Sequence, residues 1–572
     1  MSRGVQTGSH PIRYWIVLTL LVSGLVVIGA RAAYLQVVAS DYLQREGDAR
    51  YLRTVTDNAH RGMILDRNGE PLAISTPVES VWIQPATFAN SRDRWPSLAK
   101  LLGLRENELR RIVKRAYGRE FMYVKRHVTP DVAERVTAMG IPGVALQREY
   151  RRYYPTGSIS AHVIGFTNID DHGQEGLELA YDHSLRSTPG KKRVLRDLYG
   201  NVVETVESIS LPIAGQDLVL SIDRRIQYLA YRELKAAIET YNARAATAIV
   251  LDARTGEILA MVNQPGFNPN NRANLRSAVF RNRAVTDVFE PGSTLKPFTI
   301  AVALESGKYM PNTLINTAPG ELRIGARTIS DRHDYGWLSV AQVIEKSSNV
   351  GAAKIALTMN KNDMWNMFRR AGFGETTGSR LPAESAGLVN APSDWVPIDQ
   401  ANVSFGYGIS VTALQLARAY GALANDGLML PVTLLRRSSP VRARRVMSPR
   451  TARQIREMLE LAVSRTGTGR AAQVLHYRVA GKTGTVHKLV SGNYVNDRYV
   501  ASFAGMAPAS NPRLVMVVTV DEPGEQRHFG GQTAAPVFSR VMTGALRLLN
   551  IPPDLPAQPV RWAAPAGNNK AT

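Results

Sequence analysis

A serine and a lysine near the middle of this chain are spaced for nucleophilic chemistry. Ser293 and Lys296 follow a Pro-Gly turn in the stretch FEPGSTLKPF. Pro297 has no amide donor and is tolerated only in the first turn of a helix, so we expect a helix to begin at about Ser293. Residues three apart share a helix face, where the amine could take the hydroxyl proton. The pair predicts a serine nucleophile beside its base.

The predicted helix start would assist the same reaction. Free amide donors at the beginning of a helix favour negative charge, and acyl transfer develops an oxyanion. The Ser-x-x-Lys spacing is weak evidence alone, because Ser97 and Lys100 repeat it inside a charged helical stretch. The Pro-Gly entry, the following proline and the downstream motifs distinguish Ser293.

A second candidate segment is Ser347-Ser-Asn349. The pattern predicts a helix from Val340, a break at this segment and a second helix from about Val350. A serine or asparagine between two helices is most often a cap. The side chains of Ser347 and Asn349 could instead project together into a cleft.

A third candidate segment is Lys482-Thr-Gly-Thr485, in a predicted edge strand. Lys482 offers a cation, Thr483 and Thr485 offer hydroxyls, and Gly484 would let a substrate backbone approach closely. The alternative is an edge strand whose polar residues only keep it soluble.

The composition describes a large, basic protein without cysteine. The chain has 572 residues and a formal net charge of +22, with 44% hydrophobic and 21% charged residues. This length predicts more than one domain. The positive net charge suggests an anionic binding partner, such as a membrane surface or an acidic envelope polymer. Disulfides, thiolate metal sites and cysteine nucleophiles are excluded. No nucleic-acid-binding motif is found, so we expect no nucleic acid partner, and we predict no cofactor and no metal.

An uncharged apolar run, Tyr14–Ala30, lies between Arg13 and Arg31. A cleaved signal peptide would explain Ala30-Arg-Ala32, but the run exceeds the usual apolar region of a signal peptide. We therefore expect a cytoplasmic tail at residues 1–13 and a transmembrane anchor at residues 14–33. Arginines before the run favour a cytoplasmic N-terminus, which would place the rest outside the cytoplasm.

Residues 34–217 are predicted to form a mixed, non-catalytic pedestal, with helical stretches near 91–116 and 129–139. Arg61–Ser75 has the strand-turn-strand pattern of a hairpin. The closely spaced carboxylates of Gly173–Glu178 could suggest general acid–base catalysis. The favoured interpretation is structural ion pairing with nearby arginines, namely Arg151, Arg152 and Arg193.

Residues 218–550 are predicted to be the catalytic domain, followed by a flexible tail at residues 551–572. The pattern predicts a helix at residues 224–241 and strands at Leu218–Asp223, Ala246–Asp252, Glu257–Val262, Val479–Thr485, Tyr499–Ala507 and Leu514–Val520. The second and third of these strands should form an antiparallel hairpin. The helix carrying Ser293 should pack on this sheet through Ile300, Ala301, Ala303 and Leu304. A basic cluster is interpreted as a solvated surface, with anionic partner binding as the alternative: Arg436, Arg437, Arg442, Arg444 and Arg445.

The three segments, in this order, match the motif set of penicillin-binding proteins and serine β-lactamases. Other stretches extend the match, including RGMILDRNGEPLAIS, RRYYPTGSISAHVIGFTN and NRAVTDVFEPGSTLKP. From about residue 12 to residue 546 the chain resembles class B penicillin-binding proteins, and most of all their cell-division branch. One departure is Val486-His487, where that branch commonly has Ala-Arg.

The resemblance implies an α+β fold. It consists of a transpeptidase domain, in which an antiparallel sheet is flanked by helices and joined to an α-helical subdomain, on an elongated mixed α/β pedestal of the dimerisation type. One N-terminal transmembrane helix would anchor it in the bacterial inner membrane, with the catalytic domain in the periplasm at the septum. The implied partners are a SEDS-family glycan polymerase and other division-complex proteins.

The implied activity is that of a serine D-Ala-D-Ala transpeptidase, which cross-links peptidoglycan stem peptides and is acylated by β-lactams. Ser293 would attack and Lys296 would be the base, while Ser347 would relay a proton to the leaving amine. Asn349 would hold the substrate amide, and Lys482 would keep the site electropositive. Thr483 and Thr485 would bind the terminal carboxylate, and the amides of Ser293 and Thr485 would form the oxyanion hole. The alternatives are a D,D-carboxypeptidase or β-lactam hydrolase, and a non-catalytic β-lactam sensor or division scaffold.

Overall fold

The computed structural model describes residues 11–43, 52–196, 202–272, 277–490, 492–524 and 526–555. Residues 1–10 of the predicted cytoplasmic tail and residues 556–572 of the predicted C-terminal tail lie outside these ranges. The chain forms two compact units, each assembled from several stretches. Arg61–Thr76 and Arg151–Arg186 belong to the unit that contains the C-terminal half, which begins at Gly215. The boundary predicted at residue 217 stays a prediction.

The first helix carries the predicted membrane anchor. Helix α1 (Pro11–Ala33) continues into the π-helical turn η1 (Tyr34–Val38). Among the described residues, Pro11–Val38 is the one helical segment whose length and apolar composition suit a membrane crossing. Most of its large apolar side chains are exposed. The helix begins three residues before the predicted anchor.

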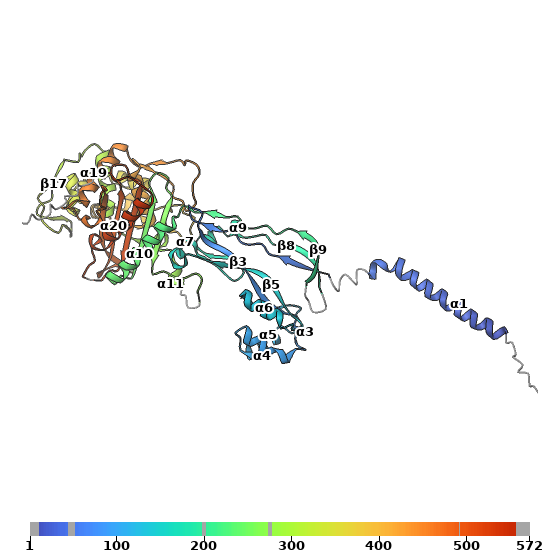
Figure 1. Ribbon diagram of the computed structural model, residues 1–572. Coiled ribbons are helices and arrows are strands. Elements are labelled where there is room, and N and C mark those ends of the chain that lie inside the picture. The colour runs from blue at the N-terminus through green and yellow to red at the C-terminus, as the bar shows by residue number, and fades with distance from the viewer. Residues whose placement is uncertain are drawn as a thin grey trace, which may run out of the picture. The chain divides into compact units, whose positions relative to one another are not determined.

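The first unit contains an antiparallel sheet in the order β1-β8-β9, formed by β1 (Leu52–Asp57), β8 (Gly190–Arg196) and β9 (Val202–Ser210). Strands β4 (Met122–Val128) and β5 (Val144–Tyr153) each pair with β3 (Pro71–Ile83). Its helices gather beside these three strands (Figure 1): α3 (Pro85–Phe88), η2 (Arg92–Arg94), α4 (Trp95–Leu101), α5 (Glu106–Arg115) and α6 (Pro130–Ala138). The stretch predicted as one helix at 91–116 is divided, because Gly103 adopts φ +64° between α4 and α5.

The hairpin predicted at Arg61–Ser75 is confirmed, because β2 (Ile64–Leu65) pairs antiparallel with the start of β3. The strand predicted at Leu218–Asp223 is shorter: β10 (Leu218–Val219) pairs parallel to β2, and Leu220 forms an isolated antiparallel bridge with Leu435. The short elements that follow β5 are η3 (Gly157–Ile159), α7 (Ala161–Ile164), β6 (Phe166–Thr167), β7 (Gly173–Glu175), α8 (Gly176–Ala180) and α9 (Asp182–Leu185).

Of the two carboxylates in Gly173–Glu178, that of Glu178 has a structural role. Glu178 accepts hydrogen bonds from Arg61 Nε and Arg152 Nε, each at 2.7 Å, and all three side chains are buried. The prediction was therefore right about Arg152, but it missed Arg61. It was wrong about Arg193, which pairs with Glu207 in the neighbouring strand.

The central sheet of the second unit has the order β12-β11-β24-β23-β22 and is antiparallel throughout. Its strands are β11 (Ala245–Asp252), β12 (Ile258–Gln264), β22 (Ala480–Val490), β23 (Asn493–Ala507) and β24 (Leu514–Asp521). Helices α10 (Arg224–Tyr241) and α20 (Gly530–Leu548) lie side by side against it (Figure 1). The predicted hairpin and the predicted helix at 224–241 are confirmed, and β22 is an edge strand, as predicted.

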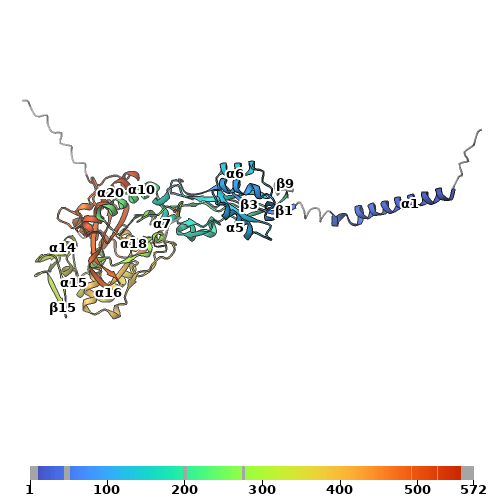
Figure 2. The same ribbon diagram turned by 90° about the horizontal axis from the view of Figure 1, so that it is seen from below.

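A helical subdomain completes the second unit. Figure 2 shows three of its helices, α14, α15 and α16, gathered apart from α10 and α20. Its main elements are η4 (Gly292–Leu295), α13 (Lys296–Glu305), α14 (Val340–Lys346), α15 (Asn349–Leu357), α16 (Lys361–Arg370), α17 (Pro397–Ser404), α18 (Ala413–Ala424) and α19 (Pro449–Val463).

The prediction that the helix carrying Ser293 packs on the sheet is right for the turn η4, on which Ser293 lies, and wrong for the helix body with the expected apolar contacts. Helix α13 packs against α15, α16 and α19, and it is the η4 turn in front of it that contacts β22 and β23. The expected apolar residues Ile300, Ala301 and Ala303 are buried, and Leu304 is partly buried. A helix that is apolar all round, as α13 is, becomes the centre of a helical cluster and does not cover one sheet face.

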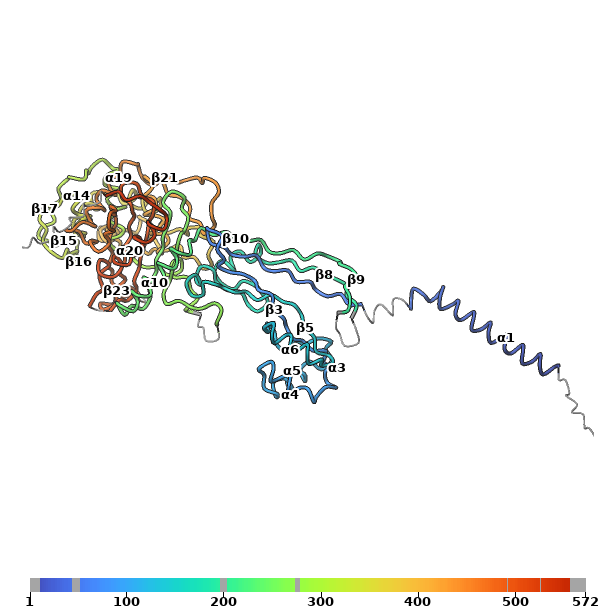
Figure 3. The backbone as a smooth tube through the Cα atoms, in the orientation of Figure 1, coloured from blue at the N-terminus to red at the C-terminus, as the bar shows by residue number. Residues whose placement is uncertain are grey.

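Short hairpins and turns fill the rest of this unit, and Figure 3 shows β15, β16 and β17 near α14. The remaining elements are α11 (Ser277–Phe280), α12 (Arg283–Thr286), β13 (Val288–Phe289), β14 (Leu314–Asn316), β15 (Glu321–Ile324), β16 (Arg327–Ser330), β17 (Trp337–Ser339), β18 (Leu388–Val389), η5 (Pro392–Asp394), β19 (Ile409–Thr412), β20 (Leu428–Met429), β21 (Arg444–Arg445) and η6 (Arg470–Ala472). The predicted α+β class is confirmed.

The predicted arginine cluster is not simply a solvated surface. Arg437 donates hydrogen bonds to the carbonyls of Thr255 and Pro431, and Arg445 donates to the carbonyl of Asp426. Arg436 and Arg444 bond to Arg67 O and to the Glu375 carboxylate, respectively. Four of the five guanidinium groups therefore hold neighbouring segments of the same chain together.

Candidate active site

Ser293 lies on the 3-10 turn η4, and the α-helix begins three residues later than predicted, at Lys296. Two hydrogen bonds fix the turn: Thr294 Oγ1 donates to Pro291 O at 2.7 Å, and Tyr420 Oη donates to Thr294 O at 2.9 Å. The Ser293 side chain is partly exposed, whereas Lys296 is completely buried. The turn therefore presents the hydroxyl to solvent above an amine that water does not reach.

The two serines at the junction of α14 and α15 have different roles. Ser348 is the N-cap of α15, and its hydroxyl accepts a hydrogen bond from Gly351 N at 2.8 Å. Ser347 ends α14 in the left-handed conformation at φ +62°, which is uncommon for a residue with a side chain. This conformation turns its hydroxyl and its carbonyl toward Lys296. Both interpretations of the segment are thus right, each for a different serine.

The Ser347 hydroxyl is the centre of a hydrogen-bonded chain. It donates to Ser293 Oγ at 3.0 Å, and it accepts from Lys296 Nζ at 3.2 Å and from Lys482 Nζ at 2.9 Å. Lys296 Nζ also donates to Ser347 O at 2.6 Å and to Asn349 Oδ1 at 2.8 Å. Within the described residues, no direct hydrogen bond joins Lys296 Nζ to Ser293 Oγ. The structure therefore brings the five predicted catalytic residues together and connects the amine to the nucleophile through Ser347.

Strand β22 reaches the nucleophile because two glycines let backbones approach closely. A Cβ on Gly484 would lie 2.9 Å from Pro291 O and 2.4 Å from Ser502 Oγ. A Cβ on Gly292, which has φ +53°, would lie 2.5 Å from Val486 Cγ1. The close approach at Gly484 is thus to the chain's own turn, whereas a substrate backbone was predicted there.

The two threonines of the β22 segment face the start of α20. Thr485 Oγ1 accepts a hydrogen bond from Gly530 N at 3.0 Å, and Thr483 Oγ1 lies 2.9 Å from Thr468 Oγ1. Successive residues of a strand point to opposite faces, so Lys482 lies on the other side of β22. The start of η4 lies close to the backbone of Thr485, because a Cβ added to Gly292 would lie 3.9 Å from Thr485 N.

Burial dominates the electrostatics of the two amines. It lowers the pKa of Lys482 to about 7. Burial, followed by the Lys482 cation, holds the pKa of Lys296 well below its ordinary value, while Asp331 acts in the opposite direction. In the described part of the chain, neither amine has a carboxylate within ion-pair distance. Such a pair can exist partly unprotonated at neutral pH, as a general base requires.

Asp331 is a site residue that sequence reasoning missed. It follows β16, and its carboxylate accepts hydrogen bonds from the Ser348 hydroxyl and from the backbone amides of Asn349 and Val350. Asp331 lies in a loop, and α14 separates it in the sequence from the start of α15. No sequence pattern connects a single aspartate with a helix start at that distance. The signal becomes visible only once the loop and the helix start are placed together.

Comparison with known proteins identifies this arrangement. A family described as "Penicillin binding protein transpeptidase domain" matches residues 246–543, and "Penicillin-binding Protein dimerisation domain" matches residues 56–220. The chain belongs to the penicillin-binding protein family. Within it the chain is a class B penicillin-binding protein of the FtsI type, as its relatives show.

Two relatives illustrate the match to this penicillin-binding protein. The chain is 42% identical to "Probable peptidoglycan D,D-transpeptidase PenA" of Neisseria meningitidis over 94% of its own length and 92% of that protein. It is 40% identical to "Peptidoglycan D,D-transpeptidase FtsI" of Escherichia coli K12 over 95% and 92% of the two chains. Penicillin-binding protein 3 of Mycobacterium tuberculosis, solved in complex with aztreonam, superposes with a TM-score of 0.69 at 29% identity, over 87% of this chain and 98% of that one.

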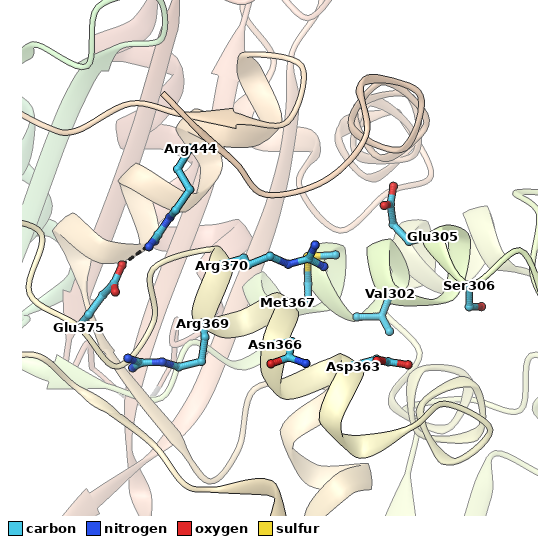
Figure 4. Close-up of a pocket in the computed structure, with 10 residues that line it drawn as sticks. All are labelled: Val302, Glu305, Ser306, Asp363, Asn366, Met367, Arg369, Arg370, Glu375 and Arg444. Carbon is cyan, nitrogen blue, oxygen red and sulfur yellow. Dashed lines mark hydrogen bonds and ion pairs between the residues drawn. The ribbon is translucent and has the colours of Figure 1, made fainter. Parts of the chain in front are cut away.

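Two cavities of this penicillin-binding protein differ in whether a residue of the three motifs lines them. One, of about 720 Å³, borders Asn349 and is also lined by Trp395, Tyr407 and His487. The other, of about 660 Å³, lies between α13 and α16 (Figure 4) and contains no residue of the three motifs. Its charged groups include the Glu375–Arg444 ion pair. Of these two cavities, the first is therefore the one that a predicted catalytic residue, Asn349, lines.

Proposed function

We propose that this penicillin-binding protein is a D,D-transpeptidase that cross-links peptidoglycan stem peptides at the division septum through an acyl-enzyme on Ser293. The observation that carries the proposal is the chain of hydrogen bonds from the two buried amines through the Ser347 hydroxyl to Ser293 Oγ. The names of the FtsI and PenA relatives support the same reaction.

In the acylation step, neutral Lys296 takes the Ser293 proton, with Ser347 placed between the two groups. Ser293 Oγ attacks the penultimate D-Ala carbonyl, and the negative charge develops beside the amides of Ser293 and Thr485. The peptide C–N bond then breaks. Ser347 passes a proton to the leaving D-Ala amine and takes one back from the Lys296 ammonium, so that Lys296 becomes neutral again and Ser293 carries the ester.

In the transfer step, the amine of a neighbouring stem attacks the ester carbonyl and gives a proton to neutral Lys296. The new amide forms as the bond between the acyl carbon and Ser293 Oγ breaks, and Ser293 Oγ regains a proton from Lys296 through Ser347. Asn349 would hold the substrate amide, and Lys482 would keep the site electropositive. Thr483, Gly484 and Thr485 would line the substrate along β22, where the threonine hydroxyls meet the terminal carboxylate. A β-lactam would acylate Ser293 by the same route, opening its ring amide without releasing a fragment.

We further propose a single-pass topology in which the anchor at residues 14–33 holds the catalytic half, residues 218–550, outside the cytoplasm. The apolar helix Pro11–Val38 supports this arrangement. Residues 34–217 would serve as the pedestal that meets a SEDS-family polymerase and other division proteins. Exposed apolar side chains along β9, namely Val203, Val206 and Ile209, support a protein contact there.

Mass spectrometry of the intact, full-length chain after penicillin treatment tests the nucleophile. We expect one adduct, mapped by digestion to the peptide that contains Ser293, and none on Ser293→Ala. Ser97→Ala is the matched control, because Ser97 has the same spacing to a lysine on α4 and should leave labelling unchanged. An adduct elsewhere would refute the assignment.

Product analysis with stem-peptide substrates separates the remaining alternatives. Cross-linked dimer supports transpeptidation, whereas free tetrapeptide alone would indicate a carboxypeptidase. A cell-division complementation assay tests the scaffold alternative, under which Ser293→Ala would still support division.

A further inference from the structure

We propose that Arg332 is a specificity-determining residue of this active site, whose guanidinium group binds a carboxylate on the acyl part of the donor. The donors that it favours are acidic: a stem peptide or a β-lactam with a second carboxylate besides the one that the threonines of β22 would bind. The inference deepens the proposed function and rests on it, because it assumes that the donor acylates Ser293. Arg332 lies outside all three motifs, in the loop that follows β16.

Arg332 lies on the same side of the active site as Asn349. Asn349 Nδ2 donates a hydrogen bond to Ser330 O at 3.4 Å. The backbone amide of Asn349 donates to the carboxylate of Asp331, the residue directly before Arg332, at 2.5 Å. Two consecutive residues of the loop are thus bonded to Asn349. The loop therefore holds Arg332 beside the side chain that would bind the donor amide.

The guanidinium group of Arg332 lies over an aromatic ring that belongs to the β22 side of the site. Its Cζ atom is 3.9 Å from the centroid of the Phe529 ring, within the range of a cation–π contact. Phe529 immediately precedes α20, and the next residue, Gly530, donates its amide hydrogen to Thr485 Oγ1 at 3.0 Å. The contact therefore joins the side that carries Asn349 to the side that carries Thr485, and the donor is proposed to lie between these two residues.

A row of neighbouring rings connects Phe529 to the central sheet. The ring centroids of His528 and Phe529 are 4.2 Å apart. His528 also stacks on Tyr499, at 4.1 Å and an interplanar angle of 13°. Tyr499 is the partner of His487 across β22 and β23, and the centroids of these two rings are 4.7 Å apart. The ring beneath the guanidinium group is therefore supported by the sheet that carries the third motif.

The charge of Arg332 is accessible to a ligand. The side chain is exposed, and in the part of the chain that the structure describes no carboxylate lies within ion-pair distance of it. The two nearest carboxylates in the sequence are bonded elsewhere: that of Asp331 to the start of α15, and that of Asp334 to Gly336 N at 2.9 Å. A guanidinium group has five N–H donors, and a contact with a ring leaves those in its plane for the two oxygens of a carboxylate.

Position and charge together indicate the ligand. The terminal carboxylate of the donor would lie at the threonines of β22, whereas the amide that Asn349 would hold belongs to the acyl part. A carboxylate that reaches Arg332 is therefore a second one, carried by the acyl part. The amines of Lys296 and Lys482 are buried at the nucleophile, while Arg332 presents its charge at the surface of the same site.

The test compares two penicillins that differ by one carboxylate, benzylpenicillin and its α-carboxy derivative, carbenicillin. The second-order rate constant for acylation of the full-length chain is measured for each, and the ratio of the carbenicillin value to the benzylpenicillin value is compared between variants. Arg332→Gln removes the charge, so this ratio should fall by about 10-fold, the low end of what a hydrogen bond to a charged group contributes. Added salt should lower the wild-type ratio and leave the ratio of the variant in place, because salt screens an exposed charge.

Arg327→Gln is the matched control. Arg327 is the first residue of β16, the strand that leads to Arg332, and it is exposed. Its replacement changes the net charge equally and should leave the ratio unchanged. An Arg332→Gln ratio equal to that of the wild type, an equal fall in both variants, or a wild-type ratio that does not respond to salt would overturn the inference.

The same measurements separate this inference from the proposed function. A wild-type chain that benzylpenicillin does not acylate, or acylation that persists in Ser293→Ala, would refute the proposed function. Acylation at Ser293 with a ratio that does not depend on Arg332 would refute only the role of Arg332.

Discussion

Two groups of charges in the second unit are equally buried but are neutralised in different ways. Arg61 and Arg152 share Glu178, and Arg61 also binds Asp182 at 2.7 Å. Lys296 and Lys482 instead share only a hydroxyl, that of Ser347. In the described residues, direct carboxylate contact is present in the first group and lacking in the second.

The pKa directions follow from this difference. Burial disfavours the Arg61 charge, but Glu178 and Asp182 outweigh it, so the pKa of Arg61 is raised. The two lysines lack such contacts, and burial lowers the pKa of each. Burial with direct counter-charges thus produces a permanent structural ion cluster, whereas burial without them produces amines that can lose a proton. A general base must be able to lose its proton, so it requires burial without a direct counter-charge.

The strongest test of the comparison is Lys296→Met. Acylation by penicillin should fall by about 10²–10⁴-fold, the usual contribution of a general base. The melting temperature should stay the same or rise, because an apolar side chain replaces a buried amine that has no ion pair. Acylation kinetics and thermal unfolding of the same preparation measure both. A large loss of stability would mean that the amine is structural.

The opposite outcome is expected for Glu178→Ala. Two buried guanidinium groups would lose their carboxylate, at a cost of about 3–5 kcal/mol in the free energy of unfolding. Denaturant unfolding measures this loss, and the acylation rate per folded molecule should be unchanged. Glu178→Gln is the milder variant if the alanine protein does not accumulate. The comparison fails if Glu178→Gln unfolds like the wild type.

Lys482→Met should change the pH profile more than it changes stability. Removal of the neighbouring cation raises the pKa of Lys296, so the acidic limb of acylation should move to higher pH by about one unit. An unmoved limb would show that the Lys482 charge does not reach Lys296.

The smallest effect is expected for Asp182→Asn. Burial opposes the charge of Asp182, but the Gly173 amide and Arg61 outweigh it and lower the pKa of Asp182 below its ordinary value. Its contribution to stability is therefore present at neutral pH and is lost as the pH falls through that lowered pKa. The variant should lose about 1–2 kcal/mol at neutral pH and little in acid. Denaturant unfolding at several pH values measures this change in the free energy of unfolding. The pH dependence of the acylation rate should be unchanged and serves as the control.

Local sequence determined the parts of the site that depend on near neighbours. The proline after Lys296 placed a helix start within three residues of its observed position. The break at Ser347–Asn349 and the edge strand at Lys482 were predicted from turn and strand patterns, and both are observed. The match of all three motifs in order indicated the family before any contact was known.

The tertiary structure decided how those parts act on one another. It placed Ser347, and not the Ser293–Lys296 spacing, between the amine and the nucleophile. It also enclosed α13 among helices and brought Asp331 to the start of α15. Sequence patterns report on residues within a few positions, while hydrogen bonds and the desolvation of charges depend on which distant segments pack together. The sequence by itself therefore indicated which residues react, whereas the pKa values of those residues depend on the tertiary structure that surrounds them.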